Sequence, residues 1–229
     1  KRETQLTSAN STANLAVGYS STSTGISAIA VRLNDLANVT TLIGLGGVQS
    51  QANAVNSAGK IAGRSLTSDN RKFNAVVFDI NGSTIDLGQF NATFAQSNAL
   101  GINDAGLVVG TAQRESGTGR MSAFVYDLNA STPTLIDLNA KLDCASDPLQ
   151  RWDLVSASDV NNNGEIIGFG TFGGQVRAFL LRPSADQVNA PIQCAPLKPE
   201  FEDKNSAGAS PIWVLLMLPL LWVRRRVGK

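Results

Sequence analysis

The stretch Ala99–Gly110 reads Ala-Leu-Gly-Ile-Asn-Asp-Ala-Gly-Leu-Val-Val-Gly, and it is one of three closely similar segments in this 229-residue sequence. The other two are Ala52–Gly63 and Ala157–Gly168, and all three fit Ala-x-x-[Val/Ile]-Asn-x-x-Gly-x-[Val/Ile]-x-Gly. A degenerate copy at Ser11–Gly18 has Asn14 in place of the middle glycine, and asparagine tolerates a left-handed backbone well. The four end glycines are separated by 45, 47 and 58 residues, and such a period indicates a repeat architecture.

Each motif copy is followed by a short run rich in Val, Ile, Leu, Phe and Thr, and in the first three units by a second run of this kind. The first run is found at Ala75–Asp79, Ala123–Asp127 and Ala178–Leu181, with Ala28–Val31 in the first unit. The second run is found at Thr84–Gly88 and Thr134–Leu138, with Thr41–Gly46 as its early version. Runs of this composition, bounded by Gly, Asn, Ser and Pro, are typical of strands. We therefore expect four short antiparallel strands in each unit.

Turn residues recur with the strands. Asparagine and glycine stand three residues apart inside each motif, as in the first and fourth positions of a tight turn: Asn56 and Gly59, Asn103 and Gly106, Asn161 and Gly164. The dipeptide Asn81-Gly82 is a strong hairpin signal between the last two strands of the second unit. The longer polar connections at 64–74 and 112–122 are where a binding surface would vary.

Four-stranded units at this period predict an all-β repeat protein similar to a β-propeller, in which each blade packs on its neighbours. The units are roughly residues 1–47, 48–95, 96–150 and 151–195. The sequence begins Lys1-Arg2 without an initiator methionine, so we expect a partial propeller with further blades upstream. An open β-solenoid and a two-sheet sandwich are the alternatives, because both also use short strands.

The composition excludes several classes of function. The chain is 43% hydrophobic and 16% charged, as expected for an ordered globular protein. Its net charge is +1, and four positive charges lie at the C-terminus in Arg224, Arg225, Arg226 and Lys229, so the body is acidic and no nucleic-acid partner is expected. The absence of histidine excludes Ser-His-Asp and Cys-His nucleophiles and histidine-ligated zinc. We expect no cofactor.

The C-terminal region differs from the repeats. Residues 196–210 form a polar linker that ends in small residues, and residues 211–229 contain an apolar run, Pro211–Val223, followed by the three arginines. We expect a hydrophobic helix that is a marginal membrane anchor or a sorting signal, with the arginines in the cytoplasm and the repeats on the far side. A buried hairpin or core helix of the last unit is the alternative.

On the motif copies and the Ala-Phe-Val-Tyr run at 123–126, the chain resembles the HAF-repeat family of bacterial extracellular proteins, including γ-proteobacterial envelope proteins of unknown function. The tail resembles the GlyGly-CTERM signal that the intramembrane protease rhombosortase recognises, although a single Gly208 within residues 207–210 replaces the glycine pair. The resemblance implies an exported protein, anchored in the inner membrane as an intermediate and then secreted or displayed on the surface. It supplies no catalytic residue.

Two further sets of residues are candidates for covalent or metal chemistry. In an exported protein Cys144 and Cys194 would pair and clamp the fourth unit, the alternative being two unrelated thiols. Asp159, Asn161 and Asn163 match the first half of a calcium loop, but Gly170 stands where the bidentate glutamate would be. The same turn occurs at the other motif copies without these acids, which favours a simple hairpin over a metal site.

The recurring acids Asp79, Asp86, Asp127 and Asp137 occupy equivalent places in their units. Recurrence favours hydrogen bonding at strand ends, because a catalytic pair would occur once. We therefore expect a non-enzymatic binding or structural module of the bacterial envelope with no catalytic residues. The alternative is an exported propeller-type hydrolase or lyase that acts on polysaccharide through two carboxylates in one cleft.

Overall fold

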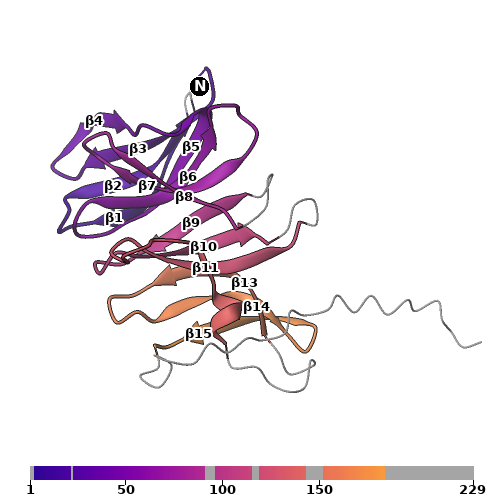
Figure 1. Ribbon diagram of the computed structural model, residues 1–229. Coiled ribbons are helices and arrows are strands. Elements are labelled where there is room, and N and C mark those ends of the chain that lie inside the picture. Colours follow the sequence, from indigo (N-terminus) through magenta and orange to yellow (C-terminus); the bar gives the residue numbers. More distant parts are fainter. Residues whose placement is uncertain (1–2, 22, 91–95, 115–118, 143–151, 184–229) are drawn as a thin grey trace, which may run out of the picture. The chain divides into compact units, whose positions relative to one another are not determined.

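A computed structural model describes residues 3–21, 23–90, 96–114, 119–142 and 152–183 (Figure 1). The chain divides into two compact units, residues 1–194 and 195–229, and the second lies outside the described residues. The described part consists of strands and one short 3₁₀ helix, so the prediction of an all-β protein is confirmed. The helix expected within 211–229 falls outside this part.

The strands form four consecutive antiparallel groups, which we call meanders 1 to 4. Meander 1 contains β1 (Thr4–Asn10), β2 (Leu15–Ser21), β3 (Ile26–Arg32) and β4 (Asp35–Thr41). Meander 2 contains β5 (Gly46–Val55), β6 (Lys60–Thr67), β7 (Phe73–Asp79) and β8 (Thr84–Gly88). Meander 3 contains β9 (Ser97–Ile102), β10 (Leu107–Gln113), β11 (Met121–Asp127) and β12 (Ile136–Asp137). Meander 4 contains β13 (Trp152–Val160), β14 (Ile166–Phe172) and β15 (Gln175–Leu181).

Within each meander every strand pairs with the next along the chain. Meanders 1 and 2 are joined into one eight-stranded sheet by a single parallel pairing between Ile26 and Gln49, whereas meanders 3 and 4 are separate sheets. Figure 1 shows β1–β8 gathered together, followed by β9–β11 and then by β13–β15. The local pairing is what short Gly- and Asn-containing turns dictate.

Two predicted strands differ in the structure. In the first unit the fourth strand is β4, Asp35–Thr41, and not Thr41–Gly46. The reason is that Leu42 is buried and its backbone N–H donates to the Ala28 carbonyl, so the chain turns there toward meander 2. In the third unit only Ile136–Asp137 pairs as a strand, and Leu138–Lys141 forms the 3₁₀ helix, which Asp137 caps by accepting from Asn139 N.

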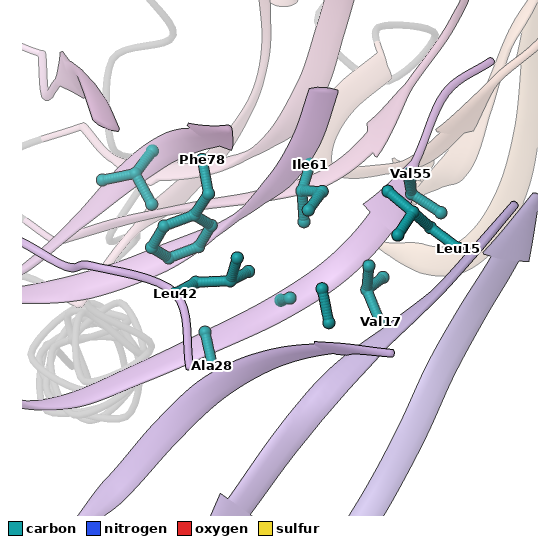
Figure 2. Close-up of a cluster of buried hydrophobic side chains, with 10 residues drawn as sticks. Leu15, Val17, Ala28, Leu42, Val55, Ile61 and Phe78 are labelled. Atoms are coloured by element: carbon teal, nitrogen blue, oxygen red, sulfur yellow. The ribbon is translucent and has the colours of Figure 1, made fainter. Parts of the chain in front are cut away.

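The hydrophobic core is divided into three clusters, one at each junction between successive meanders. The first joins meanders 1 and 2 through Val17, Ala28, Ile61 and Phe78, among others (Figure 2). The second joins meanders 2 and 3, and the third joins meanders 3 and 4. Full burial of one aliphatic or aromatic side chain contributes about 1.5–3 kcal/mol. Each meander is therefore stabilised chiefly by contact with its sequence neighbours.

An extra residue, a β-bulge, interrupts the first strand of every meander at the same place. The unpaired residues are Thr7, Asn53, Leu100 and Ser158. Opposite each bulge stands the end glycine of the motif, and a Cβ atom at any of these glycines would overlap a carbonyl oxygen of the bulged strand. The motif glycine is therefore required by the close approach of two backbones, and the bulge turns its own side chain away from the ladder.

Candidate functional site

A polar groove of about 400 Å³ lies along the first strands of all four meanders. All four bulge residues are at or beside it: Thr7, Asn53 and Ser158 line it directly, and Leu100 lines it with an apolar side chain. The polar lining residues are Thr7, Ser8, Asn10, Asn53, Asn56, Asn103, Asp104, Ser158, Asp159 and Asn162. Two carboxylates are among the lining residues, together with amides and hydroxyls, but no basic or aromatic side chain.

The bulge side chains tie neighbouring first strands together. Thr7 Oγ1 donates to the Ala52 carbonyl at 2.8 Å, and Asn53 Nδ2 donates to the Ala99 carbonyl at 2.6 Å. Asn53 Nδ2 also lies 2.9 Å from Asn98 Oδ1. Leu100 has no polar atom with which to continue the series. The floor of the groove is thus held by hydrogen bonds that repeat from one meander to the next until Leu100.

The motif asparagines form a second series of contacts at the end of the groove. Asn56 Nδ2 donates to the Asn103 carbonyl at 3.0 Å, and Asn103 Nδ2 donates to the Asn161 carbonyl at 2.9 Å. Asn56 and Asn103 are only 4% and 3% exposed. Each side-chain oxygen accepts from the backbone of its own turn, at Lys60 N and Leu107 N. The side-chain amide of each of these two asparagines therefore closes its own hairpin turn and also binds the turn of the next meander.

The residues that follow these asparagines form a parallel series at the surface. Ser57 N donates to Asp104 Oδ1 at 2.8 Å, and Asp104 N donates to Asn162 Oδ1 at 3.0 Å. Asn162 Nδ2 returns a hydrogen bond to Asp104 Oδ2 at 2.8 Å. Hydrogen bonds from Ser57 and then Asn162 hold the pKa of the Asp104 carboxyl below its usual range. Asp104 is therefore an anion at neutral pH.

The second carboxylate, Asp159, lies beside the backbone of meander 3. A Cβ atom at Gly101 would stand 2.9 Å from both the Cα and Oδ1 atoms of Asp159. Asp159 Oδ1 also accepts from the Val160 backbone N–H at 2.8 Å. Gly101 thus makes room for this carboxylate, which explains why the motif copy Ala99–Gly110 has a glycine two residues after its alanine.

The predicted turn residues lie where the sequence placed them. The glycine N–H donates to the asparagine carbonyl in all three motif turns, at 3.0 Å for Gly59, 3.2 Å for Gly106 and 3.0 Å for Gly164. The three glycines have positive φ, as does Asn14, whose N–H donates to the Ser11 carbonyl in the degenerate first copy. The left-handed exit that favours glycine or asparagine is present in every copy.

The calcium candidates are engaged in hairpin contacts. Asn161 Oδ1 accepts from the backbone N–H groups of Asn163 and Glu165, and Asn161 Nδ2 donates to Glu165 Oε2. Asp159 lines the groove, on the other side of Val160. Within the described ranges no three acidic, cysteine or histidine side chains gather to hold a metal ion. The local hydrogen bonds account for this turn without a cation.

The four recurring aspartates each accept the backbone N–H two residues further along. The donors are Asn81 for Asp79, Gly88 for Asp86, Asn129 for Asp127 and Asn139 for Asp137, at 2.8–2.9 Å. This contact is an Asx turn, and it lies at or near the end of each strand. Asp79 also pairs with Lys60 at 2.8 Å. None of these four aspartates is among the residues that line the groove.

A known protein family matches more than half of the chain. Residues 46–177 match the family described as "Protein of unknown function (DUF3466)". The chain belongs to the DUF3466 family. The matched region begins with β5 and reaches into β15, so it contains all three full motif copies. No curated protein matches the chain.

Sequence reasoning on this DUF3466 chain singled out Asn56, Asn103 and Asp159 among the groove residues, but it missed the bulge residues. The bulge residue is always the one that follows the motif alanine, at Asn53, Leu100 and Ser158, and its identity varies. The signal was present as the two variable positions between the alanine and the aliphatic residue. In a regular strand, two residues that face the core are separated by one residue. The motif has two residues between its alanine and its aliphatic residue, and the extra one indicates a bulge.

The remaining predicted sites lie outside the described residues. They are Cys144, Cys194, Gly208, Arg224, Arg225 and Arg226. In the part of the chain that the structure describes, no helix is long and apolar enough to cross a membrane.

Proposed function

We propose that this DUF3466 chain is a non-enzymatic binding module of the bacterial envelope, built like part of a β-propeller, whose ligand lies in the groove along the first strands. The face-to-face packing of successive meanders in chain order supports the propeller-like arrangement. In that arrangement the first strands surround the axis, where propeller ligands commonly bind.

One observation carries the proposal: three of the four equivalent first strands, together with the turns that follow the first strands, present hydrogen-bonding side chains to a single groove and hold them in place. Asn56 and Asn103 are fixed by contacts on both sides, and Asp104 is fixed by Ser57 and Asn162. A site whose polar groups are already ordered loses little conformational entropy on binding. Rigid, repeated polar groups suit recognition better than proton transfer.

The lining defines the chemistry of the ligand. Amides, hydroxyls and two carboxylates can accept and donate hydrogen bonds to hydroxyl and amide groups, and the carboxylates repel anions. Among the described residues that line the groove there is no arginine or lysine to neutralise phosphate or sulfate. The proposal is therefore a neutral or cationic hydroxyl-rich ligand, with uncharged polysaccharide as the class to test.

The test is a binding screen of the full chain against an array of oligosaccharides, followed by titration of any hit. We expect binding that weakens at least tenfold in Ser158→Leu and Asp159→Asn, which alter the groove. The control is Val39→Thr on β4, which is exposed and does not line the groove. Binding unchanged in both groove variants would refute this location.

The second candidate, a polysaccharide hydrolase or lyase, is kept because Asp104 and Asp159 both line the groove. A general acid in such an enzyme needs a raised pKa, whereas the pKa of Asp104 is lowered. Product release from any bound oligosaccharide, abolished in Asp159→Asn, would establish the enzyme and refute the binding module.

We also propose that the protein is exported, and that the tail with Gly208 and the arginines Arg224, Arg225 and Arg226 anchors it until a rhombosortase-type protease cuts it. The support is the resemblance of the tail to the sorting signal. Cell fractionation should show that changing the three arginines to alanine reduces surface delivery, and mass spectrometry should find a new C-terminus near Gly208. Unchanged delivery with an intact tail would refute this route.

The proposed bridge between Cys144 and Cys194 follows from export, because disulfides persist in oxidising compartments. Peptide mapping of the exported protein under non-reducing conditions should recover the two cysteines in one linked fragment. Two free thiols would refute the bridge.

A further inference from the structure

The groove has one apolar side chain that the packing of the core does not explain. Leu100 lines the groove and is only partly buried. Among the described residues that line the groove, the other apolar ones belong to a core cluster or pack against one: Ala54, Val55, Ile102 and Val160. Leu100 is in none of the three clusters of the described chain. Its apolar surface is therefore available in the groove.

The bulge does not require a leucine at position 100 either. The equivalent residues in the other three meanders are polar, and Thr7 and Asn53 each donate a hydrogen bond to the next first strand. A leucine cannot make the corresponding hydrogen bond to β13, and at this position it gains no place in the core in exchange. A polar residue would serve the fold better, so Leu100 is best explained by what enters the groove.

Hydrogen-bonding side chains lie on both sides of Leu100. On one side lies β5, because Asn53 Nδ2 donates at 2.6 Å to the carbonyl of the residue before Leu100. On the other side lies β13, because a Cβ atom at Gly101 would stand 2.9 Å from Asp159 Oδ1. Ser158 precedes Asp159 on this strand and lines the groove with it. The apolar side chain is therefore flanked by an amide on one side and by a hydroxyl and a carboxylate on the other.

We propose that the groove binds an oligosaccharide of acetamido sugars and that Leu100 determines this specificity; this inference rests on the proposed binding function of the groove. The acetyl methyl group packs on Leu100, the amide N–H donates to the carboxylate of Asp159, and the amide carbonyl accepts from the Ser158 hydroxyl. A sugar hydroxyl in this place would leave the leucine without an apolar contact. An ammonium group would meet the carboxylate but not the leucine. The acetamido group satisfies both.

The test compares three oligosaccharides of the same length and linkage, the oligomers of N-acetylglucosamine, glucosamine and glucose. They differ only in carrying an acetamido, an ammonium or a hydroxyl group at the same carbon of each sugar. We expect the full chain to bind the acetylated oligomer at least about tenfold more tightly than either of the others, since one methyl group in an apolar contact can discriminate by that factor. Calorimetric titration measures the three dissociation constants.

Substitution at position 100 tests whether the leucine sets this preference. Leu100→Thr, which copies Thr7, should reduce the preference for the acetylated over the glucose oligomer at least about fivefold and leave binding of the glucose oligomer unchanged. Leu100→Met keeps an apolar side chain of similar volume and should keep the preference. The matched control is Leu36→Thr on β4, at an exposed leucine outside the groove lining, and it should change none of the constants. Circular dichroism would show that each variant is folded, and a merely structural effect would weaken all three oligomers equally.

The outcomes separate this inference from the binding function on which it rests. Equal binding of the three oligomers, tighter binding of the glucosamine oligomer, or a preference that Leu100→Thr leaves unchanged would overturn the acetamido assignment. So would an array on which the only bound oligosaccharides lack acetamido groups. In each of these cases, weaker binding in Ser158→Leu would leave the binding function of the groove standing. A chain that binds no oligosaccharide at all would refute both.

Discussion

The carbonyl oxygen of Asn98 lies so close over Gly110 that a Cβ atom at residue 110 would overlap it. The same hypothetical atom would stand 2.8 Å from the ring of Phe124, which pairs with Gly110 across the sheet. The glycine is thus confined between the bulged strand on one side and a buried aromatic ring on the other. The same two-sided confinement holds for Gly63 with Phe78 and for Gly168 with Phe179, whereas a Cβ atom at Gly18 would overlap only the backbone of β1.

This confinement predicts that Gly110→Ala is strongly destabilising. We expect a loss of about 3 kcal/mol in the free energy of unfolding, because neither a backbone carbonyl nor a buried ring can move aside without loss of packing. The control is Gly174→Ala, where φ is positive but no atom lies within 4 Å of the new Cβ, and about 1 kcal/mol is expected. Urea denaturation of both variants measures the difference, and equal losses would contradict the steric explanation.

The contacts of the motif asparagines predict that the buried Asn103 contributes more to the free energy of unfolding than the exposed Asn161 does. Asn103→Ala removes a donor to the Asn161 carbonyl and an acceptor for Leu107 N, and we expect a loss of about 2–3 kcal/mol. Asn161 is exposed and its Nδ2 binds only within its own turn, at Glu165. Asn161→Ala should therefore cost about 1 kcal/mol. Denaturation curves that rank the two variants in the opposite order would show that the contact between meanders contributes little.

Replacement of Asn103 by aspartate predicts a dependence on pH. The new carboxylate would be buried and would face the Asn161 carbonyl oxygen without a proton to donate, so its folded-state pKa should be raised above about 3.9. A raised pKa means that stability is present below the unfolded pKa and is lost as pH rises through the folded pKa. The deficit of Asn103→Asp relative to wild type should therefore shrink between pH 7 and pH 4. A deficit independent of pH in thermal melts would contradict this.

The repeat signal predicted the strands better than it predicted the connections and the groove. Alternating apolar runs and Asn-x-x-Gly turns are local, so β6, β7, β10 and β11 follow from the sequence. The fourth strand of meander 1 could not be predicted, since every residue of Asp35–Thr41 is exposed and the segment has no regular apolar alternation. The groove depends on bulges, and a bulge is visible only when two strands are set in register.

The bulge predicts the outcomes of substitution and deletion at Asn53. Asn53→Leu reproduces the residue at the equivalent position 100, and we expect a loss of about 1 kcal/mol from the hydrogen bond to the Ala99 carbonyl. Deletion of Asn53 leaves one residue between Ala52 and Val55, so regular alternation keeps both of them on the core face. We therefore expect the deletion variant to fold, as judged by circular dichroism, and to lose the same hydrogen bond. A deletion variant that does not fold would show that the packing of this strand requires the bulge.

The ion pair between Lys60 and Asp79 predicts the response of stability to acid. The hydrogen bond from Lys60 and then that from Asn81 N lower the pKa of Asp79. A depressed pKa contributes stability above the unfolded value of about 3.9, and this contribution is lost as pH falls through the folded pKa. Because the pair is partly exposed and screened, Asp79→Asn should cost less than about 1 kcal/mol at pH 7. The difference from wild type should shrink as pH falls below the unfolded value of about 3.9, and it should vanish once the carboxyl of folded Asp79 is protonated. The comparison variant is Asp127→Asn, which can keep the Asx contact at Asn129 through its own Oδ1 and removes no ion pair within the described residues, so added salt should reduce the loss for Asp79→Asn alone. Equal salt sensitivity of the two variants in urea denaturation would show that the charge of the Asx-turn aspartate, and not its pairing with Lys60, carries the effect.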